Sequence, residues 1–243
     1  MDGYLLVLAL AALPAAGNFA GGLLAEAFDV SRRALSLALH LAAGIVIGVV
    51  GLELLPRALE ASAPWVPLLA FVAGGALFLG LERAIGYVKG RVGDGDDDVG
   101  PLAIFSGVSI DLFSDGVLIG TGTVVNPVLG LLLAVGQVPA DVPEGFAAVA
   151  TLRASGVPRR RRLLLAAGFA LPVLAGATLG YFALRDAPDL VTLSVLALTG
   201  GALVTVVVEE MVPEAHEGET SPWGAVALTA GVALFGAISV YAG

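Results

Sequence analysis

The sequence predicts an all-α integral membrane protein with eight transmembrane helices. Of its 243 residues, 58% are hydrophobic and only 14% are charged, and the mean hydropathy is +0.94. Soluble domains have about 45–50% apolar and about 25% charged residues. Eight stretches reach the roughly 20 apolar residues that a helix needs to cross a bilayer, and no stretch resembles a strand. The chain from 1 to 243 is therefore expected to form a single transmembrane domain.

Short segments rich in Gly, Pro and charged residues separate the eight expected spans. Examples are DVSRR at 29–33, NP at 126–127 and RASGVPRRRR at 153–162. Such segments favour turns and helix ends. In chain order the expected spans are 3–27, 34–56, 65–87, 101–125, 128–152, 162–184, 190–213 and 222–242.

The basic residues set the expected orientation, because cytoplasmic loops carry an excess of Lys and Arg. Ten of the twelve basic residues fall on one side of the predicted spans, and only Arg57 and Arg185 fall on the other. The ten are Arg32, Arg33, Arg83, Lys89, Arg91, Arg153 and Arg159 to Arg162. This separation favours an even number of spans. We expect a multi-pass protein of the cell membrane with both termini extracellular.

An internal repeat occurs at an offset of 157 residues. GLELLPRALE at 51–60 aligns with VEEMVPEAHE at 208–217, and AGGALF at 73–78 aligns with AGVALF at 230–235. The matched spans would cross the membrane in opposite directions, as in inverted-repeat transporters. Chance similarity between helices rich in Gly, Ala and Leu is the alternative.

The repeat predicts a 3+2+3 arrangement of helices. The first three-helix repeat would cover 1–88 and the second 162–243. The helix pair at 101–152 would lie outside the repeat and between its two halves. Because only Asn126 and Pro127 separate the two spans, we expect antiparallel neighbours.

Four carboxylates lie within the apolar spans of this central pair. Asp111 and Asp115 are four residues apart on one helix, and Asp141 and Glu144 are three apart on the next. Both spacings put the two side chains on one helix face. A carboxylate at the bilayer centre costs about 2.5–3.5 kcal/mol on insertion scales. Facing acid pairs form an oxygen-rich site suited to a divalent cation; four protonated acids that hydrogen-bond between the helices are the alternative.

The strings around these acids resemble motifs of the ZIP family of divalent metal transporters. That family has His-Asn-x-x-Glu/Asp-Gly on its fourth helix and His/Gln-Asp/Glu/Asn-x-Pro-Glu-Gly on its fifth. Here the strings are DLFSDG at 111–116 and ADVPEG at 140–145, and EEMVPEAHE at 209–217 is similar to the family's Glu-Glu-x-x-Pro-Glu-Ala-His. The resemblance covers the whole chain. It implies a homodimer that carries Zn²⁺, Mn²⁺ or Fe²⁺ into the cytoplasm by alternating access.

Residue by residue, the resemblance implies a metal site at Asp111, Asp115 and Glu144, with Asp141 beside them. Leu112 stands where the family has Asn, Ala140 where it has His or Gln, and Leu171 where helix six often has Glu. The second metal position of the family thus loses ligands, and we expect one ion per protomer. Asp111 replaces the family's His, and carboxylates suit Mn²⁺ or Mg²⁺. The all-oxygen site therefore favours Mn²⁺ or Fe²⁺ as the carried ion, although Zn²⁺ binds carboxylates too.

A second group of polar residues lies toward the expected cytoplasmic side. His40 is on the second span, and Glu210, Glu214 and His216 are at the end of the seventh. The family resemblance favours a metal-exit or regulatory role for them. A packed neutral histidine and a solvated helix end are the alternatives. The acidic loop GDGDDD at 93–98 is either a weak metal-binding loop or a solvated linker.

Composition disfavours several other classes of function. The net charge of −9 argues against a nucleic-acid partner. The chain has no Cys, and it has no glycine-rich phosphate loop with Lys, so neither a catalytic cysteine nor ATP binding is expected. We expect no enzyme and no organic cofactor. Two alternatives stay open: a non-transporting membrane metal sensor or scaffold, and an intramembrane aspartyl hydrolase with Asp115 and Asp141 as its dyad.

Overall fold

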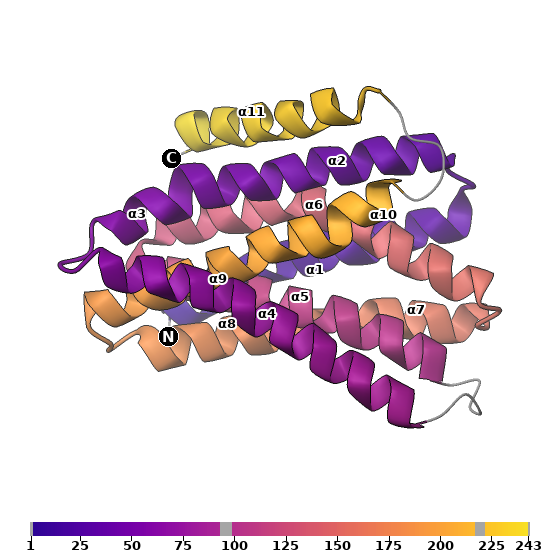
Figure 1. Cartoon of the computed structure of the whole chain (residues 1–243), viewed down its shortest axis with the longest axis horizontal. Helices are drawn as coiled ribbons and strands as arrows, with labels where there is room; N and C mark the ends of the chain where they lie inside the picture. Colours follow the sequence, from indigo (N-terminus) through magenta and orange to yellow (C-terminus); the bar gives the residue numbers. More distant parts are fainter. Residues whose placement is uncertain (1, 93–98, 217–221, 243) are drawn as a thin grey trace.

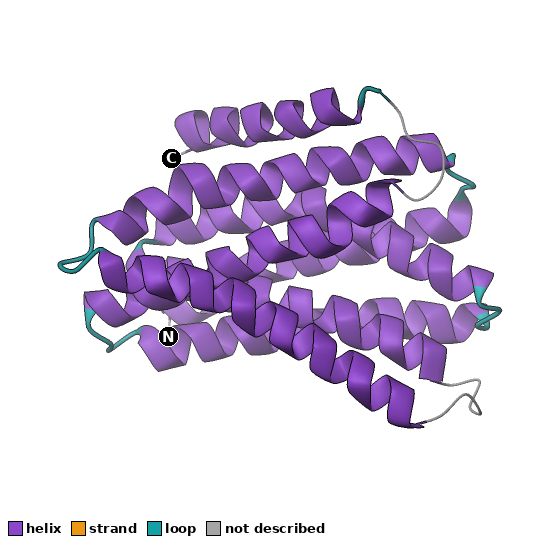
Figure 2. Cartoon of the chain, viewed as in Figure 1, coloured by secondary structure: helices purple, strands orange, loops and turns teal. Residues whose placement is uncertain are grey.

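A computed structural model describes residues 2–92, 99–216 and 222–242. The predicted acidic loop at 93–98 and Glu217 of the repeat lie outside these residues. Within them the chain forms helices and no strand (Figure 2). In order the helices are α1 (Asp2–Ala27), α2 (Arg32–Gly48), η1 (Val49–Leu54), α3 (Leu55–Leu59), α4 (Trp65–Val92), α5 (Val99–Val125), α6 (Pro127–Ala154), α7 (Arg159–Gly168), α8 (Ala170–Leu184), α9 (Asp189–Val206), η2 (Val207–Met211), α10 (Val212–His216) and α11 (Gly224–Ala242).

Seven described segments are long and apolar enough to cross a membrane. They are Gly3–Ala27, Arg32–Leu59, Trp65–Ala84, Phe105–Val125, Arg159–Leu184, Asp189–His216 and Gly224–Tyr241. The eighth expected span forms the 28-residue helix α6 but is not among these seven. Its sequence holds Gln137, Asp141 and Glu144 together with three prolines. These residues lower its apolarity, because α6 carries polar groups for the protein interior.

The bundle places both termini at the same end, which we call the terminal end (Figure 1). The opposite end carries Arg32, Arg33, Arg153 and the run from Arg159 to Arg162, and we call it the basic end. Large apolar side chains such as Leu69, Val72 and Leu171 are more than 60% exposed on the outside of the bundle. Such a surface is suited to lipid and not to water.

Helix α6 lies at the centre of the packing. Helix α1 packs along α6, α8 along α5, α9 along α4 and α11 along α2, while α5 and α2 also contact α6. Asn126 starts α6 by accepting a 2.8 Å hydrogen bond from the N–H of Val128, and Pro127 follows as the first helical residue. This tight turn makes α5 and α6 antiparallel neighbours, as predicted.

Glycines bring the outer helix pairs to backbone contact. A Cβ atom on Gly44 of α2 would lie 1.9 Å from the carbonyl oxygen of Leu228 in α11. A Cβ atom on Gly201 of α9 would lie 1.8 Å from the carbonyl oxygen of Phe71 in α4. Positions 44 and 201, and positions 71 and 228, are each 157 apart. A second matched set at the same offset is Gly231 with Leu41 and Gly74 with Leu198.

The same offset relates two π-helical turns. Helix η1 runs from Val49 to Leu54 and η2 from Val207 to Met211, and each leads into a five-residue α-helix. Pro56 and Pro213 follow these turns in sequence. Because proline has no N–H and clashes with the carbonyl four residues earlier, the helix widens before it. The widened bonds run from the N–H of Leu55 to Val50 and from that of Val212 to Val207.

These contacts predict which glycines tolerate a methyl group. We expect Gly44→Ala to lower the melting temperature in detergent by several degrees, since overpacking costs about 1–3 kcal/mol. Gly80→Ala is the matched control, because no heavy atom lies within 4 Å of its built Cβ atom. The control should melt at or above the native temperature. Equal melting of the two variants would show that the α2–α11 contact is not tight.

Candidate metal-binding site

The four predicted carboxylates line one small cavity between the central helices. Helix α5 contributes Asp111 and Asp115, and α6 contributes Asp141 and Glu144. Asp115 and Asp141 are each only 1% exposed, Asp111 is 8% exposed, and Glu144 is partly buried. The cavity has a volume of about 10 Å³, which is the smallest space that holds one water molecule. The remaining lining residues are Val46, Gln137, Ala140, Leu203, Val206 and Met211.

Gln137 belongs to this site, and the sequence prediction missed it. Its side-chain Nε2 donates a short hydrogen bond to Oδ1 of Asp115 across the α5–α6 interface. A signal for it was present in the sequence: Gln137 precedes Asp141 by four residues and Glu144 by seven, so the three share a helix face. The bond fixes the position of the Asp115 carboxylate.

Each helix carries an acid followed by glycine, and the glycine faces a different neighbouring helix from the acid. A Cβ atom on Gly116 would lie 2.0 Å from the carbonyl oxygen of Val173 in α8. A Cβ atom on Gly145 would lie 2.0 Å from the carbonyl oxygen of Asn18 in α1. The glycines therefore allow α8 and α1 to pack closely against the acidic helices, while the acids line the cavity.

The site holds polar atoms that no described protein group satisfies. Oδ1 of Asp111, Oε1 of Gln137 and Oδ2 of Asp141 are buried without a hydrogen-bond partner. A buried unsatisfied polar atom costs about 1–3 kcal/mol. As they stand, however, no three His, Cys, Asp or Glu side chains in the described part of the chain converge into a group that could hold a metal ion. The acids share a cavity without meeting at one point.

Glu210 reaches the same region from the seventh span. It lies on the π-helical turn η2, and its charge acts on both Asp111 and Glu144. The wide turn before Pro213 is what places it there, and its repeat counterpart is Glu53 on η1. Glu53 instead lies at the terminal end, where Arg57 donates to it at 3.3 Å and Ser239 of α11 forms a short hydrogen bond with it.

The two predicted histidines come together at the basic end. The rings of His40 and His216 meet edge to face with their centroids 4.9 Å apart. Nδ1 of His40 lies 2.8 Å from the carbonyl of Ser36, and Nδ1 of His216 lies 2.7 Å from the carbonyl of Val212. A carbonyl only accepts, so each Nδ1 carries hydrogen and each Nε2 presents a lone pair in the neutral ring. Ser36 also donates to the carbonyl of Ala215 at 2.6 Å, which ties α2 to α10.

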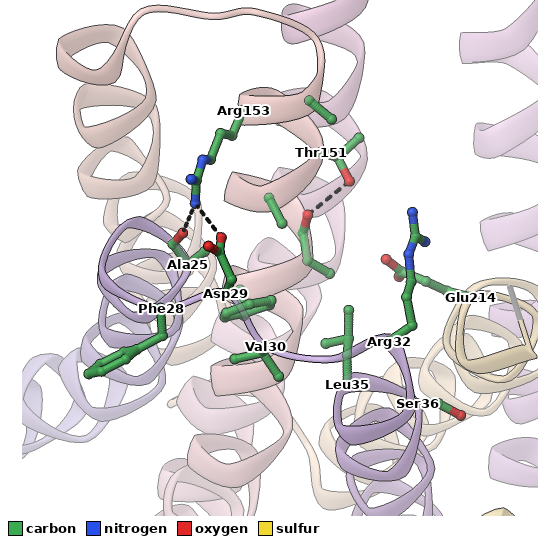
Figure 3. Close-up of a pocket in the computed structure, with 14 residues that line it drawn as sticks. Ala25, Phe28, Asp29, Val30, Arg32, Leu35, Ser36, Thr151, Arg153 and Glu214 are labelled. Carbon is green, nitrogen blue, oxygen red and sulfur yellow. Dashed lines mark hydrogen bonds and ion pairs between the residues drawn. The ribbon is translucent and has the colours of Figure 1, made fainter. Parts of the chain in front are cut away.

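A larger cavity, which we call the vestibule, lies at the basic end of the bundle (Figure 3). Its volume is about 650 Å³. Phe146 and Ala147 of α6 line it, one turn or less from Glu144, and the predicted residue Glu214 lines it from α10. Figure 3 shows Arg153 donating to Asp29 at 3.2 Å on one wall, with Arg32 near Glu214 on the other.

A comparison with protein-family models matches the C-terminal part of the chain. Residues 98–241 match the model of the family described as ZIP Zinc transporter. No curated protein matches the chain. The matched region is 144 residues, more than half of the chain, and it contains both acidic helices and the segment from 209 to 216 on which the predicted resemblance rested. The chain therefore belongs to the ZIP zinc transporter family, a family of multi-pass membrane proteins that transport divalent metal ions.

Proposed function

We propose that this protein moves one divalent transition-metal ion at a time into the cytoplasm through the site formed by Asp111, Asp115, Asp141 and Glu144. The observation that carries the proposal is four buried or partly buried carboxylates around one cavity whose lining holds no Lys or Arg. Their charges repel one another strongly in a medium of low dielectric constant. A passing dication offsets that repulsion and draws the acids together.

The donor set favours a borderline or hard dication. All four predicted ligands are carboxylates. Oε1 of Gln137 adds a neutral oxygen that accepts no hydrogen bond from the described residues. Oxygen donors suit Mn²⁺ and Fe²⁺, and Zn²⁺ also binds carboxylates. We propose these three ions as substrates and no organic cofactor.

Three apolar residues support a mononuclear site. Leu112 is fully buried among α8 residues, so it packs away from the cavity. Leu171 is 71% exposed on the outside of the bundle. Ala140 lines the cavity but has no ligand atom.

We further propose alternating access with the basic end in the cytoplasm. The vestibule at that end reaches Phe146 of α6, two residues after Glu144. At the terminal end, hydrogen bonds among Glu53, Arg57 and Ser239 join α11 to η1 and α3. This difference between the ends fits a conformation that faces the cytoplasm. The matched glycine contacts and π-helical turns support a 3+2+3 inverted repeat. If the two halves exchanged conformations, access to the acidic site would change from one end of the bundle to the other. We propose a homodimer in the lipid bilayer, with extracellular termini.

The other functions are less well supported. A hydrolase would need room for a peptide beside its aspartate pair, and the acidic cavity holds about one water molecule. A sensor or scaffold would bind metal without moving it. A measurement of metal uptake therefore distinguishes a transporter from a hydrolase and from a sensor.

Neutralising one acid tests the proposed site. We expect Glu144→Gln and Asp115→Asn to abolish uptake of Zn²⁺ or Mn²⁺ into proteoliposomes, because each removes a charged ligand from a buried site. Glu82→Gln is the matched control on α4, where Glu82 is exposed. Full uptake by both site variants would rule out this site. If the native protein cleaved peptides and took up no metal, the hydrolase would be favoured. If it bound metal and transported none, the sensor would be favoured.

Gln137→Leu tests whether the amide holds Asp115 in place. We expect the affinity for Zn²⁺ to fall about 10–100-fold, the usual effect of losing a residue that orients a ligand. Isothermal titration of the purified protein measures it. Gln137→Glu restores a side-chain oxygen but not the N–H donor. This variant should bind Zn²⁺ more tightly than Gln137→Leu. Unchanged affinity in Gln137→Leu would mean that the bond to Asp115 has no part in binding.

The histidine pair can be tested cleanly because the chain has only two histidines. If His40 and His216 lie on the exit path, Zn²⁺ should shift the Nε2 resonances of ¹⁵N-histidine-labelled protein. The shift should appear only after the carboxylate site is saturated and should persist in Asp115→Asn. Unshifted Nε2 resonances at saturating Zn²⁺ would mean that both histidines are purely structural.

A further inference from the structure

A groove lies between α1 and the α7–α8 segment, remote from the acidic cavity. Its volume is about 330 Å³. Every lining residue is apolar, and most are alanine: Ala12, Ala15, Ala16, Phe19, Ala167, Ala170 and Leu174. Several of these residues, such as Ala16 and Ala167, are exposed on the outside of the bundle. The groove therefore faces the hydrocarbon region of the bilayer.

The groove exists because two antiparallel helices touch at both ends and separate between them. At one end the hydroxyl of Tyr4 is 3.1 Å from that of Thr178. At the other end Arg162 forms a bidentate pair with Glu26, with one bond of 2.5 Å and one of 2.9 Å. Between these contacts the small alanine side chains leave the space unfilled.

Proline interrupts both walls of the groove. Pro14 lies inside α1, and Pro172 lies in the first turn of α8. Neither can donate to the carbonyl four residues earlier, so each wall lacks one backbone hydrogen bond. Helix α7 accordingly ends at Gly168, and α8 begins at Ala170. Phe169 of this connection is fully buried, and its ring stacks on the partly buried ring of Phe105 with the centroids 5.1 Å apart.

A strongly basic segment begins α7 at the cytoplasmic edge of this groove. Arg159 and Arg162 turn toward Glu26, which neutralises part of their charge. Arg160 is exposed and forms no ion pair within the described part of the chain. It precedes Ala167 by seven residues, so it lies on the same helix face, about 10 Å along the axis. The cationic residue Arg160 therefore lies at the basic end of the apolar groove.

We propose that the groove and Arg160 bind one anionic glycerophospholipid, with an acyl chain in the groove and the phosphate on Arg160. Charge complementarity selects this occupant. Basic residues next to a membrane helix attract anionic lipids, with about 1 kcal/mol for each Arg. A zwitterionic lipid carries its own cation beside the phosphate and gains less. The site is independent of the proposed metal transport.

Photo-crosslinking tests the site directly. The protein is placed in phosphatidylcholine nanodiscs that contain a small fraction of phosphatidylglycerol with a diazirine in mid-chain. We expect labelling of peptides that contain residues 12–19 and 167–174. Arg160→Gln should reduce that labelling about fivefold, and Ala16→Leu should reduce it by filling the groove. Arg33→Gln removes an equal charge at the same end, and Ala230→Leu adds equal bulk on exposed α11; neither control should reduce it.

Three results would overturn the proposal. Equal labelling by phosphatidylcholine that carries the same diazirine would mean a general lipid contact without recognition of charge. Equal loss in Arg160→Gln and Arg33→Gln would mean attraction by the net charge of the basic end alone. Crosslinks that join two copies of the chain through residues 12–19 would mean that a second protomer covers the groove. Size-exclusion profiles identify any variant that misfolds, and the surface variant Arg160→Gln then decides.

Discussion

The structure depends on one constraint: negative charge placed inside a membrane bundle must meet a positive partner. Asp115 and Asp141 are almost completely buried, and the cavity that they share with Asp111 and Glu144 has no Lys or Arg in its lining. A permanent ion pair with Lys or Arg would satisfy these acids, but they would then be unable to bind a transported cation. Glu53 shows the contrast, because Arg57 and Ser239 satisfy it within the protein. In our proposal, the unsatisfied oxygens of the acidic site bind a cation that enters and leaves.

Glycine and proline build the frame around this site. Gly116 and Gly145 let α8 and α1 reach backbone contact behind the acids, so the two central helices are held from outside. Pro56 and Pro213 follow the two π-helical turns, which carry Glu53 and Glu210 at matching positions of the repeat. In the proposed inverted repeat, the two halves would change which end of the bundle is open while the acidic site keeps its residues. Membrane helices in general pack through such small residues.

Periodicity and charge predicted much of this arrangement from the sequence. The acid spacings placed Asp111 with Asp115 and Asp141 with Glu144 on shared faces, and the Asn126–Pro127 turn predicted the antiparallel pair. The family assignment is confirmed, as are seven of the spans by length and apolarity. Gln137 was missed because a neutral amide in an apolar run gives no charge signal. The approach of His40 to His216 could not be read from the sequence, since it depends on how two distant spans pack. The metal role of all these residues stays a prediction.

Anomalous scattering from a crystal soaked in Zn²⁺ tests the central proposal most directly. We expect one anomalous peak per chain between α5 and α6, about 2.0–2.2 Å from carboxylate oxygens of Asp115 and Glu144. The four acids should have moved toward that peak. A peak elsewhere, with the acids still apart and no ion between them, would contradict the idea that these buried carboxylates hold the ion in transit.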